Sequence, residues 1–156
     1  MFMSAISYRQ ASQSDIPAMA GLRSAEWGEQ NYWQNRIAGY IAGELDPQHA
    51  LKPRAVFVAM QNEALIGFIA GHLTRRYGCD GELEWINVVP GNRGNGTAAE
   101  LLRLLAQWFM EHKARRICVD VDPANSAARG FYRKHGATDL NRQWLVWDDI
   151  SMVMAD

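Results

Sequence analysis

The fold is decided by one stretch of sequence, Val88-Val89-Pro90-Gly91-Asn92-Arg93-Gly94-Asn95-Gly96-Thr97-Ala98, in which a strand ends and a helix begins directly after a glycine-rich turn. Glycines in such a turn allow backbone torsions that a Cβ atom would forbid. Free N–H groups at the start of the helix, with the positive end of its dipole, suit a phosphate or pyrophosphate group. The stretch therefore predicts either an anion-binding loop or a plain tight connection.

Two familiar phosphate-binding patterns are absent from this turn. The pattern G-x-x-x-x-G-K-[ST] does not occur, and G-x-G-x-x-G would need a glycine at position 99, where Ala99 stands. A nucleotide-binding domain that uses the same turn remains an alternative, and it predicts that ATP or NAD competes for the site.

Hydrophobic periodicity around the turn predicts a single mixed α/β sheet in the order β-α-α-β-β-β-α-β-α-β. The helix after the turn is the clearest, since its apolar residues recur at i, i+3, i+4, i+7 and i+11 from Ala98 to Phe109. Ser14 is predicted to cap the first helix, and Asp46-Pro47 to end the second. The predicted strands span 6–10, 55–60, 64–74, 82–89, 116–121 and 143–147, and the other helices span 15–27, 32–45 and 126–135.

Length and composition indicate one globular domain over residues 1–156, with 48% apolar and 21% charged residues. The net charge of −1 argues against a protein that holds nucleic acid by bulk electrostatics. No apolar run is long enough to cross a membrane, and the first residues do not resemble a signal peptide. Cys79 and Cys118 are expected to be free thiols, so a cytoplasmic location is predicted.

Two segments together resemble the GNAT (GCN5-related N-acetyltransferase) family. Arg93 to Ala98 is similar to that family's R/Q-x-x-G-x-G/A loop for the acyl-CoA pyrophosphate. Asn125 to Ala137 is similar to its N-x-x-A-x-x-[FL]-Y-x-[KR]-x-G-F segment, and Leu83 to Val88 matches the core strand before the loop. The departures are small, with Ala98 where glycine is more usual and Ala137 in place of phenylalanine.

The resemblance implies an enzyme that moves the acetyl group of acetyl-CoA to a primary amine by direct attack in a ternary complex. It implies a splayed central sheet, in which a gap between strands 82–89 and 116–121 holds the pantetheine arm and backbone groups near Ile86 and Val88 pair with it. Asn125 would cap the following helix and also contact this arm. The pyrophosphate would be bound by Arg93, Gly94, Asn95, Gly96, Thr97 and Ala98.

Tyr132 is the leading candidate for the general acid. It lies seven residues after Asn125, at the spacing that the family uses for the tyrosine near the CoA sulfur. A phenol with a pKa near 10 stays protonated at neutral pH and can protonate a departing thiolate. The alternative is a helix tyrosine that packs in the core beside Phe131.

Three carboxylates are candidates for the general base, in the order Glu82, Glu84, Asp120. A regular strand would point Glu82 and Glu84 to one face, whereas a bulge would separate them. By resemblance, Glu82 matches the catalytic glutamate of histone-type members, and Asp120 matches the glutamate of ribosomal-protein N-terminal acetyltransferases. Each could instead be a solvated or salt-bridged carboxylate, with a water chain acting as base.

The acceptor site is predicted around a loop with aromatic and acidic side chains, which could hold a cationic amine by cation–π and charge contacts. Its residues are Glu26, Trp27, Tyr32 and Trp33, with Trp85 from the core strand. The same aromatics could simply cover the core. The expected acceptor is a small amine or a protein N-terminus, with no nucleic acid and no membrane, and a homodimer is left open.

Two further expectations concern the alternatives to this enzyme. The four histidines show no i, i+4 pair and no cysteine partner at ligand spacing, so no metal site is predicted. The competing function from another class is a non-catalytic acyl-CoA-binding or sensing module.

Overall fold

The structure is a computed structural model that describes residues 5–44 and 47–155. Its strands form one seven-stranded sheet in the order β1-β2-β3-β4-β5-β7-β6. The strands are β1 (Ser7–Gln10), β2 (Ala50–Gln61), β3 (Ala64–Thr74), β4 (Gly81–Val88), β5 (Ile117–Asp120), β6 (Thr138–Asp139) and β7 (Trp144–Trp147). The helices are α1 (Ile16–Glu26), α2 (Gln30–Ala42), α3 (Thr97–Glu111) and α4 (Ser126–Lys134), with short 3-10 turns η1 (Gln13–Asp15), η2 (Arg76–Gly78), η3 (Pro90–Asn92) and η4 (Ile150–Met154). The predicted mixed α/β class is confirmed.

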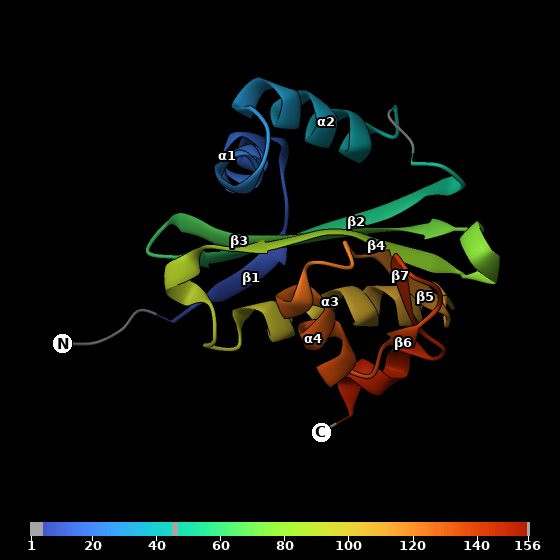
Figure 1. Ribbon diagram of the computed structural model, residues 1–156. Helices are drawn as coiled ribbons and strands as arrows, with labels where there is room; N and C mark the ends of the chain where they lie inside the picture. The colour runs from blue at the N-terminus through green and yellow to red at the C-terminus, as the bar shows by residue number, and fades with distance from the viewer. Residues whose placement is uncertain (1–4, 45–46, 156) are drawn as a thin grey trace.

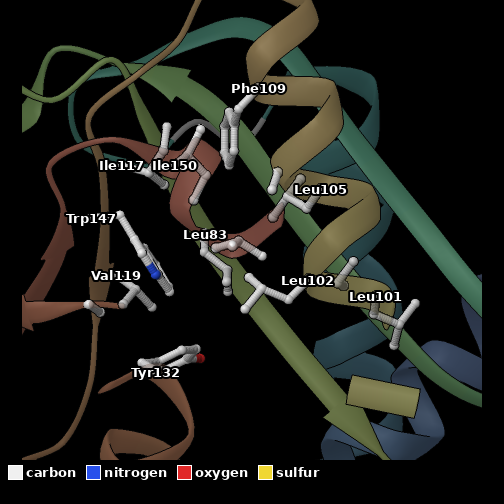
Figure 2. Packing of buried hydrophobic residues seen from close by; sticks show 14 of the residues in the cluster. Leu83, Leu101, Leu102, Leu105, Phe109, Ile117, Val119, Tyr132, Trp147 and Ile150 are labelled. Atoms are coloured by element: carbon white, nitrogen blue, oxygen red, sulfur yellow. The ribbon is translucent and has the colours of Figure 1, made fainter. Parts of the chain in front are cut away.

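Helices cover both faces of this sheet, with α1 and α2 on one face and α3 and α4 on the other (Figure 1). The predicted apolar stripe of α3 is confirmed: Leu101, Leu105 and Phe109 are buried against Leu83 and Ile117 of the sheet (Figure 2). On the opposite face, a second apolar cluster joins α1 and α2 to the sheet. Its largest members are Met19, Trp33, Ile37, Tyr40, Phe68 and Trp85.

The predicted gap in the sheet lies between β4 and β5. These two strands are parallel, and they pair only at Gly81 with Ile117, Glu82 with Cys118 and Leu83 with Val119. Beyond this point β4 continues to Val88 without a partner strand on that side. The sheet is therefore open along the second half of β4.

A β-bulge interrupts β4 at Glu84. Leu83 pairs with Gly71 and Trp85 pairs with Ala70, so Glu84 has no partner on β3. Side chains of successive strand residues normally alternate between faces. Here Leu83 belongs to the core under α3, whereas Trp85 belongs to the core under α1 and α2. Because Glu84 is an extra residue, Leu83 and Trp85 point to opposite faces of the sheet, whereas a regular strand would point both to one face.

Several predicted boundaries are wrong at the helix and strand ends. Ser14 does not cap the first helix, because its hydroxyl lies 2.8 Å from the hydroxyl of Ser12. The backbone N–H of Ser12 donates to the carboxylate of Asp15. The second helix begins at Gln30 and ends where Gly43 takes a left-handed torsion, φ 76°. The predicted end of that helix at Leu45 and Asp46 lies outside the described residues.

Strand β2 begins at Ala50, five positions earlier than predicted, and the short strand β6 was missed. Pro53 lies within the irregular start of β2, where the pairing with β3 shifts between Ala50 and Arg54. Cys79 and Cys118 are both buried and both free, as predicted. Among the described residues, no helix combines the length and apolar character needed to cross a membrane.

Candidate active site

Two cavities lie side by side along β4. One, of about 460 Å³, is lined by Ile86, Asn87 and Val88 together with the glycine-rich turn and α4. The other, of about 690 Å³, is lined by residues 82–85 of the same strand. They are called the loop cavity and the charged cavity below. The two are therefore adjacent where β4 passes from Trp85 to Ile86.

The turn before α3 has the geometry that its glycines suggest. Gly94 and Gly96 adopt positive φ angles of 84° and 89°, which L-residues with a side chain rarely take. Arg93 folds back on the strand end, and its Nε donates to the carbonyl of Val88 at 3.0 Å. The hydroxyl of Thr97 donates to Asn95 Oδ1 at 2.7 Å. These torsions and hydrogen bonds thus fix the conformation of the turn at the start of α3.

The predicted cofactor residues divide into two groups. Ile86, Val88, Arg93, Gly94, Ala98 and Asn125 all line the loop cavity. Thr97 is buried under the turn, and it supports the turn together with Asn95. Asn125 is the predicted N-cap of α4, since its Oδ1 accepts the backbone N–H of Ala128 at 3.1 Å.

Tyr132 lines the loop cavity from α4 and is only 5% exposed. Its ring lies on the side of the core formed by Val119 and Trp147 (Figure 2), with an edge-on contact to Trp147 at 5.7 Å between centroids. Burial raises the pKa of the Tyr132 hydroxyl above its usual value. The side chain therefore packs in the core, as the alternative prediction held, and also presents a protonated phenol to the cavity.

Glu26 lies at the loop cavity and is absent from the lining of the charged cavity. Its carboxylate pairs with the guanidinium of Arg93 and accepts a hydrogen bond from Asn87 Nδ2 at 3.3 Å. Asn87 Oδ1 in turn accepts from Arg23 at 2.9 Å. A continuous polar chain therefore runs from the turn before α3 to the charged cavity, which Arg23 lines.

All three candidate bases line the charged cavity. Glu82 is only 4% exposed; its Oε1 lies 3.2 Å from Nε of Arg76 and 3.6 Å from Nε2 of His72. Of the two alternatives for Glu82 and Glu84, a bulge is present, but it does not separate the two carboxylates. The donor atoms of His72, Glu82 and Glu84 all lie within 4.8 Å of one another. The alternation of side chains between the two faces of β4 is regular up to Glu84 and changes only after it. Glu82 and Glu84 therefore lie on the same face, as they would in a regular strand.

The three carboxylates differ in how they are satisfied. Glu82 accepts from Arg76, whereas Oε1 of Glu84 is buried and has no hydrogen-bond partner. Burial raises the pKa of Glu84, and the nearby charge of Glu82 raises it further. Partial burial also raises the pKa of Asp120, again with a contribution from Glu82. Glu84 is thus the carboxylate of the three that combines a raised pKa with a buried oxygen that accepts no hydrogen bond.

His72 was missed from the sequence. It is fully buried in β3, its Nδ1 lies 2.8 Å from the hydroxyl of Tyr40 in α2, and its Nε2 has no hydrogen-bond partner. The signal that the sequence offered was a histidine, a titratable residue, inside an otherwise apolar strand. Together with Glu82 and Glu84, it is the set of described side chains whose donor atoms are close enough to hold one metal ion. No linear spacing could show this set, because it comes from two paired strands.

The predicted aromatic residues are split between core and surface. Trp33 and Trp85 are buried and in edge-on contact at 5.8 Å, whereas Trp27 is 63% and Tyr32 50% exposed. Trp33 Nε1 donates to the backbone carbonyl of Trp27 at 2.6 Å. Of these aromatics, only Trp85 lines the charged cavity. The lining of the charged cavity also includes three arginines that were not predicted as site residues, Arg23, Arg36 and Arg76.

The gap beside β4, the turn before α3 and the buried phenol of α4 are the features that the resemblance to the GNAT family predicted. The chain belongs to the acetyltransferase (GNAT) family, whose model matches residues 19–137. An uncharacterized N-acetyltransferase of Mycobacterium tuberculosis is 28% identical over 134 residues, which are 86% of this chain and 80% of that protein.

Two N-acetyltransferases are also similar to this chain. The type 1 aminoglycoside N(6')-acetyltransferase of Salmonella typhimurium is 29% identical over 94 residues, which are 56% of this chain and 65% of that enzyme. The solved structure of the PaiA N-acetyltransferase of Thermoplasma acidophilum in complex with coenzyme A superposes with a TM-score of 0.70. It covers 91% of this chain and 98% of its own, at 18% sequence identity, so it supports the fold alone.

Proposed function

We propose that this protein transfers the acetyl group of acetyl-CoA directly to a primary amine in a ternary complex. The observation that carries the proposal is the meeting of the two cavities on β4. One contains the turn before α3 and a protonated phenol, and the other contains a buried carboxylate with an unpartnered oxygen. A thioester at their junction would have an acid on one side and a base on the other.

Acetyl-CoA would bind along the open edge of β4. Backbone groups near Ile86 and Val88, which lack a partner strand on the β5 side, would pair with the pantetheine arm. The pyrophosphate would lie at the N-terminus of α3, where Gly94 and Gly96 let it approach the backbone. Most of this binding uses N–H groups rather than cationic side chains, which agrees with the net charge of −1.

Glu84 is the proposed general base. The incoming ammonium group loses a proton to its free Oε1, and the neutral nitrogen attacks the thioester carbon. Glu82 is less suited, because Arg76 already donates to its Oε1. The raised pKa of Glu84 makes it a stronger base than an exposed glutamate.

Tyr132 is the proposed general acid. As the tetrahedral intermediate collapses, the C–S bond breaks and the phenol donates its proton to the departing sulfur. The nitrogen then gives its remaining extra proton to the Tyr132 phenolate, so that the products are an amide and free CoA thiol and the phenol is restored. A route through an acyl-cysteine is disfavoured, since Cys118 is fully buried.

A panel of primary amines with acetyl-CoA, followed by release of free thiol, tests this function. We expect thiol release that depends on the amine and a stoichiometric N-acetylated product detected by mass spectrometry. Tight CoA binding without transfer to any amine in a broad panel would contradict the proposal. That outcome would favour the acyl-CoA-sensing module instead.

A further inference from the structure

The charged cavity contains groups of both signs, which constrains the acceptor. Its lining includes the guanidinium groups of Arg23, Arg36 and Arg76 and the carboxylates of Glu82, Glu84, Asp120 and Asp122. Within this set, Arg76 and Glu82 neutralise each other through a contact of 3.2 Å. The cavity then retains two arginines, Arg23 and Arg36, and three carboxylates, Glu84, Asp120 and Asp122.

Arg23 is held in place without an ion pair, although the charges of Glu26 and Glu84 lie near enough to act on it. Its guanidinium lies 4.4 Å from the centroid of Trp33 and donates to the neutral amide of Asn87 at 2.9 Å. Its Nε is buried and has no hydrogen-bond partner. Leaving a buried donor unpaired costs free energy, so such an atom points to a missing acceptor group.

Arg36 adds a second cation from α2. It is half-buried and lines the same cavity. Neither Arg23 nor Arg36 forms an ion pair with any carboxylate of the residues that the structure describes. Two guanidinium groups thus face one cavity without a bound anion from the protein.

In the same cavity Glu84 Oε1 lacks a hydrogen-bond donor, whereas Arg23 Nε lacks an acceptor. Both atoms are buried. A polycationic acceptor could pair with Glu84, Asp120 and Asp122, but it would leave Arg23 Nε without an acceptor. An acceptor that carries an ammonium group and a carboxylate satisfies both deficiencies at once. A bidentate contact between guanidinium and carboxylate is also the strongest polar contact that such a ligand can make.

We propose that the acceptor is a small zwitterion, a free amino acid or a compound of the same charge pattern. Its ammonium group binds at Glu84 and its carboxylate at Arg23 and Arg36. This inference rests on the proposed acetyl transfer. It differs from the acceptor class of the Salmonella aminoglycoside acetyltransferase, since an aminoglycoside carries amines and no carboxylate. A cavity of about 690 Å³ is large enough for such a molecule.

The first test compares three kinds of acceptor at equal acetyl-CoA concentration: the L-amino acids, their carboxamides and neamine. A carboxamide keeps the amine and removes only the negative charge. We expect kcat/KM for the best amino acid to exceed that for its carboxamide and for neamine by about tenfold or more. Equal or better transfer to the carboxamide or to neamine overturns the zwitterion while leaving acetyl transfer intact. Transfer to no amine overturns the proposed function as well.

The second test uses Arg36→Gln, with Arg103→Gln as the matched control on the exposed surface of α3. Loss of a charge-assisted contact should raise KM for the amino acid by about tenfold and leave kcat/KM for its carboxamide within twofold. Arg103 pairs with Glu100 and lies outside both cavities, so its variant should match the unaltered protein. An equal loss on both acceptors, or no loss on either, contradicts the inference. Unchanged CoA affinity shows that the variant is folded.

Discussion

The loop cavity and the charged cavity share one strand but are built in different ways. The loop cavity takes nearly all its lining from two continuous segments, residues 86–98 and 125–132, and much of that lining is backbone or small side chains. The charged cavity collects side chains from α1, α2, η2, β4, β5 and β7. A common cofactor can be bound by a local motif, whereas an acceptor is selected by charges that only the tertiary fold brings together.

The largest effect is expected for Tyr132→Phe, which removes the acid from the loop cavity. The turnover rate should fall by about a hundredfold or more, because the thiolate must then leave without a proton. The dissociation constant for CoA should stay within twofold, since Phe keeps the packing against Trp147. Stopped-time thiol assays and calorimetric CoA titrations provide the two values.

Tyr77→Phe is the control, because Tyr77 is 49% exposed in η2 and lies outside both cavities. Unaltered turnover in the Tyr132 variant would remove the general acid from this site.

The next effect is expected for Glu84→Gln, which removes the base from the charged cavity. The value of kcat/KM should fall by about a hundredfold. The base acts only when ionised, so the rate of the unaltered protein should fall as the pH decreases through the raised pKa of Glu84. That acid limb should lie above the pH range of an ordinary glutamate and should be missing in the variant.

Glu82→Gln is the comparison for this second variant. It leaves Arg76 and His72 without their charged partner, so it should lower the free energy of unfolding more than Glu84→Gln does. If Glu82→Gln alone abolishes the acid limb, then Glu82 is the base.

A smaller effect is expected for Gly96→Ala in the turn before α3. A Cβ at this position would meet no atom within 4 Å, so the cost is torsional at φ 89°. A residue with a side chain pays about 1–2 kcal/mol in the left-handed region, so CoA affinity should fall about tenfold if the turn relaxes. Gly91→Ala is the matched control, since Gly91 also has open space and lacks a positive φ. Equal CoA affinity in both variants would show that the torsion is not required.

The smallest effect on catalysis is expected far from both cavities, at Asp15. Arg9 and the N–H of Ser12 hold the pKa of this carboxyl at about 2. Because the folded-state value lies below the ordinary value near 3.9, the stabilisation is complete above that value and is lost as the pH falls toward 2. Asp15→Ala should lower the free energy of unfolding by about 1 kcal/mol at neutral pH, with kinetic constants unchanged. Urea unfolding at several pH values measures this.

The contrast between the cavities also explains what could be predicted from the sequence. The turn from Arg93 to Ala98, the stripe of α3 and the cap at Asn125 depend on neighbours in sequence, and they were predicted. His72 and Arg36 depend on strand register and helix placement, and they were missed. The contact of Arg76 with Glu82 was not predicted either, because it requires η2 to fold back over β4.

Glu26 shows that the neighbours of a residue in sequence do not predict its partner in the fold. Its place next to aromatic residues suggested an acceptor contact, yet the fold brings it to Arg93 across 67 residues of sequence. Similarly, Glu82 and Glu84 were both named, but their relative position depended on where the bulge falls. Sequence spacing cannot fix a bulge, because the extra residue is defined by the partner strand.

The bulge at Glu84 has a consequence for how this site can change over time. Leu83 and Trp85 already face opposite cores, so a deletion of residue 84 would leave a regular strand with both of them correctly buried. Deletion of one codon would therefore convert a fold that carries this carboxylate into the same fold without it. The chemistry can be gained or lost by a change in chain length, while the apolar pattern that folds the protein stays the same.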